Sequence, residues 1–198
     1  MIKLIFQSIR QTLVWTIVCG VLYPLAITAI AQLAFPDKAN GSLVERDGKL
    51  VGSSLLAQQF TDPKHFWPRP SAASYGTGAS GIAGSSGSNH GPTSAQLQTD
   101  VRNNVKSLRD AHKLAADAPV PADLVYASAS GLDPHISPEA ARFQIARVAA
   151  ARGVGEDKVR ALVEQYIEPP QWGFLGEARV NVLLLNLALD AADAKKSG

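Results

Sequence analysis

The chain has 198 residues, 46% of them hydrophobic, and a formal net charge of +2. Without Lys3 and Arg10, 17 basic residues stand against 17 acidic ones, so the remainder of the chain is neutral and lacks the basic face that nucleic-acid binding requires. The only cysteine, Cys19, excludes a disulfide-stapled scaffold. We therefore expect no nucleic-acid partner and a single domain held together by packing.

An uncharged segment, residues 11–36, predicts one transmembrane helix. Its apolar core covers residues 13–35, and at about 1.5 Å of rise per residue a helix of that length crosses the roughly 30 Å hydrocarbon core of a bilayer. Lys3 and Arg10 precede the span without an acidic neighbour, and positive flanks stay in the cytoplasm. The sequence thus predicts a cytoplasmic tip at residues 1–10 and an exported soluble domain at residues 37–198.

A cleaved signal peptide is the alternative. Ala29, Ile30 and Ala31 form a small-x-small pattern, after which a mature chain would begin at Gln32. The apolar run is longer than the roughly 7 to 15 residues of a usual signal core, which favours the anchor. Gly20, Tyr23 and Pro24 interrupt the span, and such residues indicate a helix that packs against other membrane helices.

The exported part begins with local signals. Residues 41–51 predict a hairpin that turns at Asp47 and Gly48. Prolines at positions 63, 68 and 70 exclude a helix and predict an ordered loop. The glycine- and serine-rich segment at residues 71–94 has the composition of a flexible linker, with a segment pinned across the domain surface as the alternative.

Three helices follow from apolar spacing. The first presents Leu97, Val101, Val105 and Leu108 on one face and carries His112 on its polar face. Residues 119–125 predict a short strand or extended piece, and residues 127–137 a turn-rich connection that contains His135. Helices at about 138–152 and 156–167 form a small αα-hairpin, expected to pack on the sheet of the 41–51 hairpin. Residues 180–192 are apolar enough for the core.

These elements predict an α+β fold: one N-terminal transmembrane helix followed by a single mixed helix/strand periplasmic domain. Residues 76–81 match G-x-G-x-x-G, but no apolar strand precedes them, so we expect no dinucleotide site. The four histidines form no close pair, so we expect no metal site and no catalytic residue. A membrane-anchored periplasmic hydrolase that uses a histidine, and a solitary binding module on a tether, are the alternatives to an accessory subunit.

Several segments, in order, resemble the C subunit of the bacterial potassium-transporting ATPase, the KdpC family. They are residues 20–25, 39–43, 52–60, 66, 69–72, 88–89, 91–93, 127–137, 144, 147–149 and 181–190. Departures are Trp67 and Pro68, where similar proteins often have glycine, and Ser86 and His90 in the glycine-rich run. Together the segments cover essentially the full chain.

The resemblance implies a non-catalytic subunit of an ATP-driven K⁺ import complex in the bacterial inner membrane. Its partners would be a K⁺-conducting subunit, an ATPase subunit and a very small accessory subunit. The family is described as a catalytic chaperone that raises the ATP affinity of the ATPase subunit, with no tightly bound cofactor. By resemblance, a nucleotide-associated role carries over to Gln144, with Ser128, Ser130 and Gly131 as nearby candidates. An exported domain would not meet cytoplasmic ATP, so the topology and direct ATP contact conflict.

Overall fold

The structure, a computed structural model, describes residues 1–73 and 84–194. It divides into two units, Met1–Ser53 and Ser54–Gly198, which are described here one at a time. The G-x-G-x-x-G motif at residues 76–81 lies outside the described residues, as does the middle of the glycine- and serine-rich segment.

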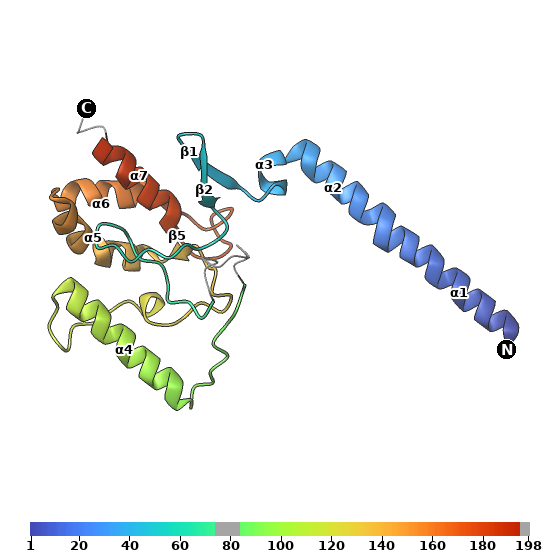
Figure 1. Ribbon diagram of the computed structural model, residues 1–198, viewed down its shortest axis with the longest axis horizontal. Helices are drawn as coiled ribbons and strands as arrows, with labels where there is room; N and C mark the ends of the chain where they lie inside the picture. The colour runs from blue at the N-terminus through green and yellow to red at the C-terminus, as the bar shows by residue number, and fades with distance from the viewer. Residues whose placement is uncertain (74–83, 195–198) are drawn as a thin grey trace. The chain divides into compact units, whose positions relative to one another are not determined.

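The first unit begins with a continuous helical rod, which Figure 1 draws in blue. It consists of α1 (Ile2–Ile17), the π-helical turn η1 (Val18–Leu22) and α2 (Tyr23–Ala34). The rod, Ile2–Ala34, has 33 residues and is long and apolar enough to cross a membrane. The helix starts well before residue 11, so Lys3 and Arg10 belong to its first turns.

The π-helical turn η1 ends at Leu22, two residues before Pro24. Proline has no N–H to offer the carbonyl four residues back, and its ring crowds that carbonyl. In η1 the backbone N–H of Tyr23 donates to the oxygen of Val18, five residues earlier, which is the hydrogen bond of a π turn. Gly20 lies inside this turn, and a Cβ built there would meet only the side chain of Thr16, at 3.9 Å. The predicted packing of Gly20, Tyr23 and Pro24 against other helices stays a prediction.

The predicted hairpin is confirmed in the first unit. After the short helix α3 (Pro36–Ala39), strands β1 (Leu43–Arg46) and β2 (Lys49–Ser53) pair antiparallel. Asp47 and Gly48 have φ values of 53° and 71°, as the turn of a tight hairpin requires.

The second unit contains four helices of more than one turn and a small sheet within its described residues. The elements are α4 (Ala95–His112), η2 (Ala122–Leu124), β3 (His135–Ile136), α5 (Pro138–Arg152), α6 (Glu156–Gln165), β4 (Ile167–Glu168), β5 (Arg179–Asn181) and α7 (Val182–Ala194). The sheet order is β3-β5-β4, with both pairs antiparallel and Val180 opposite Ile136 and Ile167. Helices α5, α6 and α7 lie together, and the 59–70 segment runs between them and α4 (Figure 1).

Capping residues set the helix ends as the sequence predicts. The Ser137 hydroxyl accepts a hydrogen bond from the Ala140 N–H at the start of α5, and Gly153 ends that helix with φ of 64°. The apolar faces predicted for the helices are confirmed in part. The buried residues are Leu108 of α4, Ala141, Ile145, Val148 and Ala149 of α5, Val159 and Val163 of α6, and Val182, Leu183, Leu185 and Leu189 of α7. The half-buried ones are Leu97, Val101 and Val105 of α4, and Leu162 and Tyr166 at the end of α6.

The αα-hairpin α5–α6 packs with the β3-β5-β4 sheet inside the second unit, and β1 and β2 form a sheet of their own in the first. The expected packing of the αα-hairpin on the 41–51 hairpin stays a prediction. Three local predictions are wrong. Residues 122–124 form a 3₁₀ turn instead of a strand, held where Asp123 accepts a hydrogen bond from the Ser137 N–H. Helix α6 ends at Gln165, because Ile167 joins the sheet as part of β4. His135 lies in β3 and not in a turn.

Candidate functional site

The centre of the second unit is the proline-rich loop predicted from prolines 63, 68 and 70, here called the clamped segment (residues 63–70). Residues 63–65 form a turn, in which the His65 N–H donates to the Asp62 oxygen at 3.0 Å, and residues 66–70 belong to no helix or strand. A chain without secondary structure that lies inside a fold needs partners for its N–H and C=O groups. Side chains from α5 and α7 supply them.

Two side-chain carboxamides make the backbone hydrogen bonds that a neighbouring strand would otherwise make. Gln144 of α5 accepts a hydrogen bond from the Trp67 N–H at 2.8 Å and donates one to the Trp67 oxygen at 3.1 Å. Asn186 of α7 does the same to Phe66, at 2.8 and 3.0 Å. Gln144, Asn186 and Phe66 are all buried. Two helices thus hold the segment at two adjacent residues.

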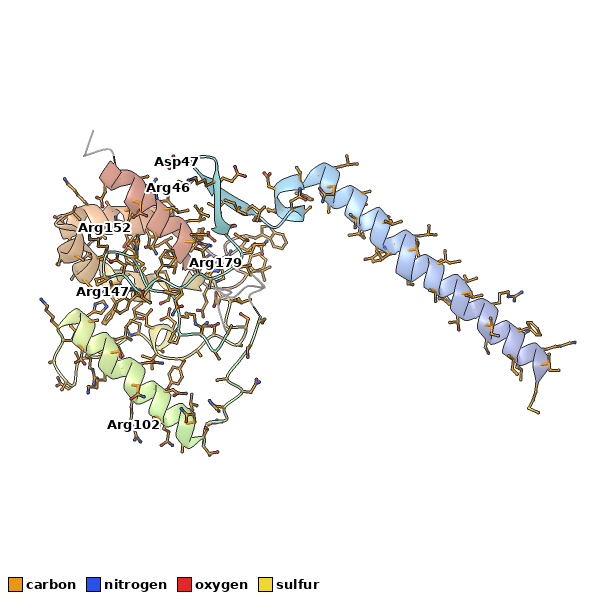
Figure 2. The ribbon with its side chains drawn as sticks, viewed as in Figure 1. Arg46, Asp47, Arg102, Arg147, Arg152 and Arg179 are labelled. Carbon is orange, nitrogen blue, oxygen red and sulfur yellow. The ribbon has the colours of Figure 1, made fainter. Side chains whose placement is uncertain are left out.

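Arg147, one turn after Gln144, fixes the beginning of the clamped segment. Its guanidinium donates to the oxygens of Pro63 at 2.6 Å and His65 at 3.0 Å, and to Gln144 Oε1 at 2.7 Å. The same group lies 4.0 Å from the centre of the Trp67 ring, a cation–π contact. Burial lowers the pKa of Arg147 to about 10, which leaves it charged at neutral pH. Figure 2 labels Arg147 on the side of α5 near α4.

Arg152 holds the same segment further along α5. Its Nε donates to the Lys64 oxygen at 2.6 Å, and its terminal nitrogens pair with Asp190 and Asp193 of α7 at 2.8 and 2.7 Å. His65 also contacts Asp190, at 3.1 Å. Burial alone would raise the pKa of Asp190, but hydrogen bonds from Arg152 and His65 lower it below its usual value. Every one of these bonds positions a backbone or a helix.

The expectation that His112 lies on a polar face is wrong. His112 is half-buried and packs against Phe143, with 4.5 Å between ring centres, and edge-on against Trp67. Its Nε2 accepts a hydrogen bond from Arg147 Nε at 3.2 Å. Desolvation by burial, together with the charge of Arg147, lowers the pKa of His112 to about 4. A neutral imidazole that accepts from an arginine is therefore part of the core at neutral pH.

The described ends of the glycine- and serine-rich segment are pinned to the 128–131 loop. Ser71 Oγ donates to the Gly131 oxygen at 2.6 Å, and the Ser86 N–H donates to the Ser130 oxygen at 3.0 Å. Gly131 has φ of 70°, and a Cβ there would lie 2.6 Å from the Ser86 oxygen and from the Ala73 side chain. Residues 71–73 and 85–87 are thus pinned across the domain surface, which is the alternative to a flexible linker. Residues 74–83 lie outside the described residues.

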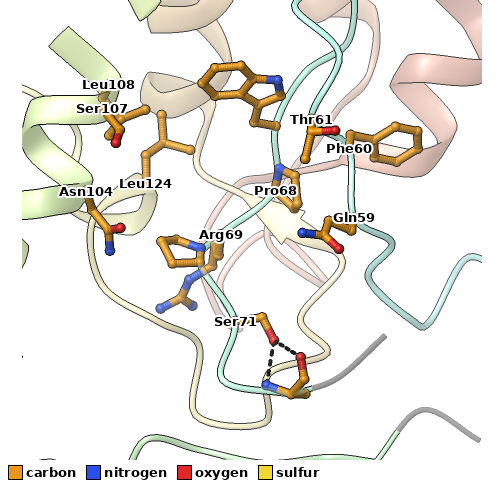
Figure 3. A pocket seen from close by; sticks show the side chains of 13 residues that line it. Gln59, Phe60, Thr61, Pro68, Arg69, Ser71, Asn104, Ser107, Leu108 and Leu124 are labelled. Atoms are coloured by element: carbon orange, nitrogen blue, oxygen red, sulfur yellow. Dashed lines mark hydrogen bonds between the residues drawn. The ribbon is translucent and has the colours of Figure 1, made fainter. Parts of the chain in front are cut away.

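A pocket of about 600 Å³ lies between the clamped segment and α4 (Figure 3). Its apolar walls come from Phe60, Trp67, Leu108 and Leu124. Two polar residues of α4, Asn104 and Ser107, also line it. Among the residues that the structure describes, Arg69 is the only charged one that lines it. Polar side chains of Gln59, Thr61 and Ser71 also line the pocket, so its walls are mixed in polarity.

Arg69 is already engaged on one side. Its Nη1 donates to Asp133 Oδ2 at 2.9 Å, while its Nε is the one buried side-chain polar atom without a hydrogen-bond partner among the described residues. Burial would raise the pKa of Asp133, but hydrogen bonds from His135 and Arg69 outweigh it and lower the pKa to about 2. The Arg69–Asp133 pair is therefore neutral overall, which weakens Arg69 as an anion ligand.

The four residues assigned to nucleotide by resemblance are placed differently from one another. Gln144 is fully buried against Trp67, and Ser128 is buried with its N–H bonded to the Pro70 oxygen. Gly131 is buried, and only Ser130 is exposed. A triphosphate needs several cations or a cradle of N–H groups, and these residues as placed do not fit one. Their nucleotide role stays a prediction. Within the described ranges, no group of three or more His, Cys, Asp or Glu side chains is placed to hold a metal ion.

Comparison with known proteins connects this geometry to a family. A family model described as "KdpC: K+-transporting ATPase, c chain" matches residues 5–191. The chain belongs to the KdpC family. Among curated KdpC subunits, those of Methylococcus capsulatus and Geobacter metallireducens are 54% and 53% identical to it, over 93% and 92% of this chain and 95% of each relative. The KdpC subunit of Polaromonas naphthalenivorans is 58% identical over 90% of this chain and 89% of its own length.

The KdpC resemblance seen in the sequence is thereby confirmed, and the hydrolase and solitary-module alternatives are not favoured. Sequence reasoning found Gln144 but missed the positioning roles of Arg147 and Asn186. Both lie in segments that resemble the KdpC family. The sequence did offer one signal: a polar residue at a helix position that the apolar spacing places in the core. A buried carboxamide or guanidinium must have a hydrogen-bond partner.

Proposed function

We propose that this chain is the non-catalytic C subunit of a K⁺-transporting ATPase, anchored in the bacterial inner membrane by the Ile2–Ala34 helix with its second unit in the periplasm. The observation that carries the proposal is that the family match, residues 5–191, includes both the apolar helix and most of the second unit. The cationic residues Lys3 and Arg10 at the start of the helix support a cytoplasmic N-terminus. The partners are a K⁺-conducting subunit, an ATPase subunit and a small accessory subunit.

The role of the polar core supports a subunit that assembles and stabilises, without chemistry of its own. The backbone of the clamped segment is hydrogen-bonded by three buried polar side chains, those of Gln144, Arg147 and Asn186. Any effect of this chain on ATP affinity passes through the ATPase subunit, because Gln144 is sealed from solvent. Gln144 is thus a positioning residue in this proposal, and ATP is a ligand of the partner.

The assembly role is tested by purifying the pump with and without this chain and measuring K⁺-stimulated ATPase activity. We expect the activity to be lost without the chain and restored by the full-length chain. Full K⁺-stimulated activity in a pump that lacks the chain would contradict the proposal.

The nucleotide part has its own test, which uses the full-length chain alone in detergent. We expect no saturable binding of a fluorescent ATP analogue. Saturable binding that Ser130→Ala or Gln144→Ala abolishes, while Arg142→Ala leaves it intact, would instead support direct nucleotide contact. Arg142 is an exposed residue of α5, so its replacement controls for nonspecific change.

A further inference from the structure

The loop between β4 and β5 carries the most exposed large aromatic side chains in the described part of the second unit. Trp172 is 77% exposed, Phe174 73% and Leu175 45%. The other large apolar side chains that the described part of this unit exposes, Leu55, Leu56, Leu114 and Tyr126, are less exposed than Trp172 and Phe174. These three apolar side chains lie within four residues and form an exposed apolar patch. We call residues 171–175 the aromatic tip.

The aromatic tip is rigid. Gln171 and Leu175 exchange two backbone hydrogen bonds, each 2.9 Å long, and the Gly173 N–H donates to the Pro170 oxygen at 2.9 Å. Trp172 has φ of 56°, a left-handed conformation that costs a residue with a Cβ about 1 to 2 kcal/mol. Backbone strain of this kind persists where the surrounding structure enforces it, and it clusters at sites of recognition. The side chains are thus presented in a fixed arrangement, which lowers the entropy lost on binding.

Charge around the tip distinguishes a protein partner from a lipid surface. Residues 169–178 contain no lysine or arginine, and their one charged residue is Glu177. The nearest cation in sequence, Arg179, is paired with Glu168 at 3.0 Å. A loop that enters an anionic leaflet gains from basic residues beside its apolar ones, and this loop has none. An acidic neighbour favours a protein pocket with a basic rim.

We propose that the aromatic tip is a docking element that inserts Trp172 and Phe174 into an apolar, basic-rimmed pocket on a membrane subunit of the K⁺-transporting ATPase. The inference rests on the proposed function and adds to it the surface that meets the partner. Tryptophan anchors of this kind supply a large share of binding free energy at interfaces. Loss of the anchors should therefore release the chain from its partners without unfolding it.

The test uses the full-length chain expressed with its pump subunits. We expect the double variant Trp172→Ala/Phe174→Ala to retain at least tenfold less partner on affinity purification, with an unchanged melting temperature. The control variant Leu114→Ala/Tyr126→Ala removes two other exposed apolar side chains and should retain wild-type amounts. Double-variant complexes that purify like wild type would overturn this inference alone, and a wild-type chain that purifies without partners would overturn the proposed function as well.

A photo-crosslinking phenylalanine analogue at position 172 identifies the occupant. We expect crosslinks to a membrane subunit of the pump. Crosslinks to lipid or to a second copy of this chain as the sole products would overturn the inference. Flotation of the purified chain on anionic vesicles through the tip, lost in the double variant, would assign the tip to the bilayer and overturn it too.

Discussion

Gln144 and Trp67 are joined by two hydrogen bonds that run in opposite directions, from Trp67 N–H to Gln144 Oε1 and from Gln144 Nε2 to the Trp67 oxygen. This is the pairing that an antiparallel neighbour strand would give. The carboxamide therefore lets a chain that contains three prolines cross the core without a strand beside it. Arg147 completes the arrangement by donating to the same Gln144 oxygen.

Replacing Gln144 with alanine should lower the free energy of unfolding by about 2 to 4 kcal/mol. The variant leaves the Trp67 N–H and C=O unpaired in the core and opens a cavity. The control Arg142→Ala, on the same helix, breaks the exposed ion pair with Glu164 and should lower the free energy of unfolding much less than Gln144→Ala does, because solvent screens that pair. Urea unfolding of the full-length chain in detergent measures both. If both variants lost the same free energy of unfolding, the hydrogen bonds from Gln144 to the clamped segment would not be what stabilises it.

Comparing Gly131→Ala with Gly153→Ala separates two contributions to the loss of stability, a steric clash of the new Cβ and the strain of a left-handed backbone. Both glycines are left-handed, with φ of 70° and 64°, so each substitution incurs about 1 kcal/mol. At Gly153 nothing lies within 4 Å of a new Cβ, whereas at Gly131 it would collide with the Ser86 oxygen and Ala73. We expect a total of about 3 kcal/mol or more for Gly131→Ala.

The Gly131 substitution should also loosen the pinned ends of the glycine- and serine-rich segment. Limited proteolysis should then cut within residues 71–94 faster in Gly131→Ala than in Gly153→Ala. Identical cleavage rates in the two variants would contradict the pinning.

His112 should make the chain less stable in mild acid. Its pKa is 6.5 in the unfolded chain and about 4 in the fold, so between these values the unfolded state binds more protons. Stability then rises with pH across this window and falls as the pH drops from about 6.5 to 4. Because His112 is half-buried, solvent screening reduces the effect to about 1 kcal/mol.

The measurement compares urea midpoints at pH 7 and pH 4.5 for the wild-type chain and His112→Gln. The glutamine variant should lose less stability over this range, whatever its stability at pH 7. Asp133, with a pKa of about 2, titrates below the window and does not obscure the result. Parallel loss in both proteins would exclude His112 as the source.

Membrane sidedness is tested with one introduced cysteine. Ala150→Cys places a thiol on an exposed position of α5, in a Cys19→Ser background that removes the natural thiol. In intact spheroplasts a membrane-impermeant maleimide should label it as completely as in lysed cells. Labelling only after lysis would place the second unit in the cytoplasm and reopen direct contact with ATP.

The helices could be predicted from the sequence because their signals are local. The stripe of Leu97, Val101, Val105 and Leu108, the Ser137 cap and the Gly153 stop each act within a few residues. The β3-β5-β4 sheet could not, because strands of two or three residues are too short to show an alternating pattern. The inward turn of His112 was also missed, because Arg147 and Phe143, which decide it, lie on another helix.

The site was half predictable. Resemblance to the KdpC family singled out Gln144, but its role depends on Trp67, 77 residues away, and that of Asn186 on Phe66, 120 residues away. No local pattern reports contacts of this range. The prolines did predict an ordered loop, and the structure explains how that loop keeps its hydrogen bonds.

The central claim is that this chain works as a subunit of a K⁺-transporting ATPase. The most direct measurement is the subunit composition and mass of the particle that carries an affinity-tagged full-length chain, extracted in mild detergent from cells that express the pump. The account predicts a single particle in which the K⁺-conducting and ATPase subunits are present in fixed proportion to the chain. A tagged chain recovered alone, at the mass of a monomer, while those subunits purify together without it, would contradict the account.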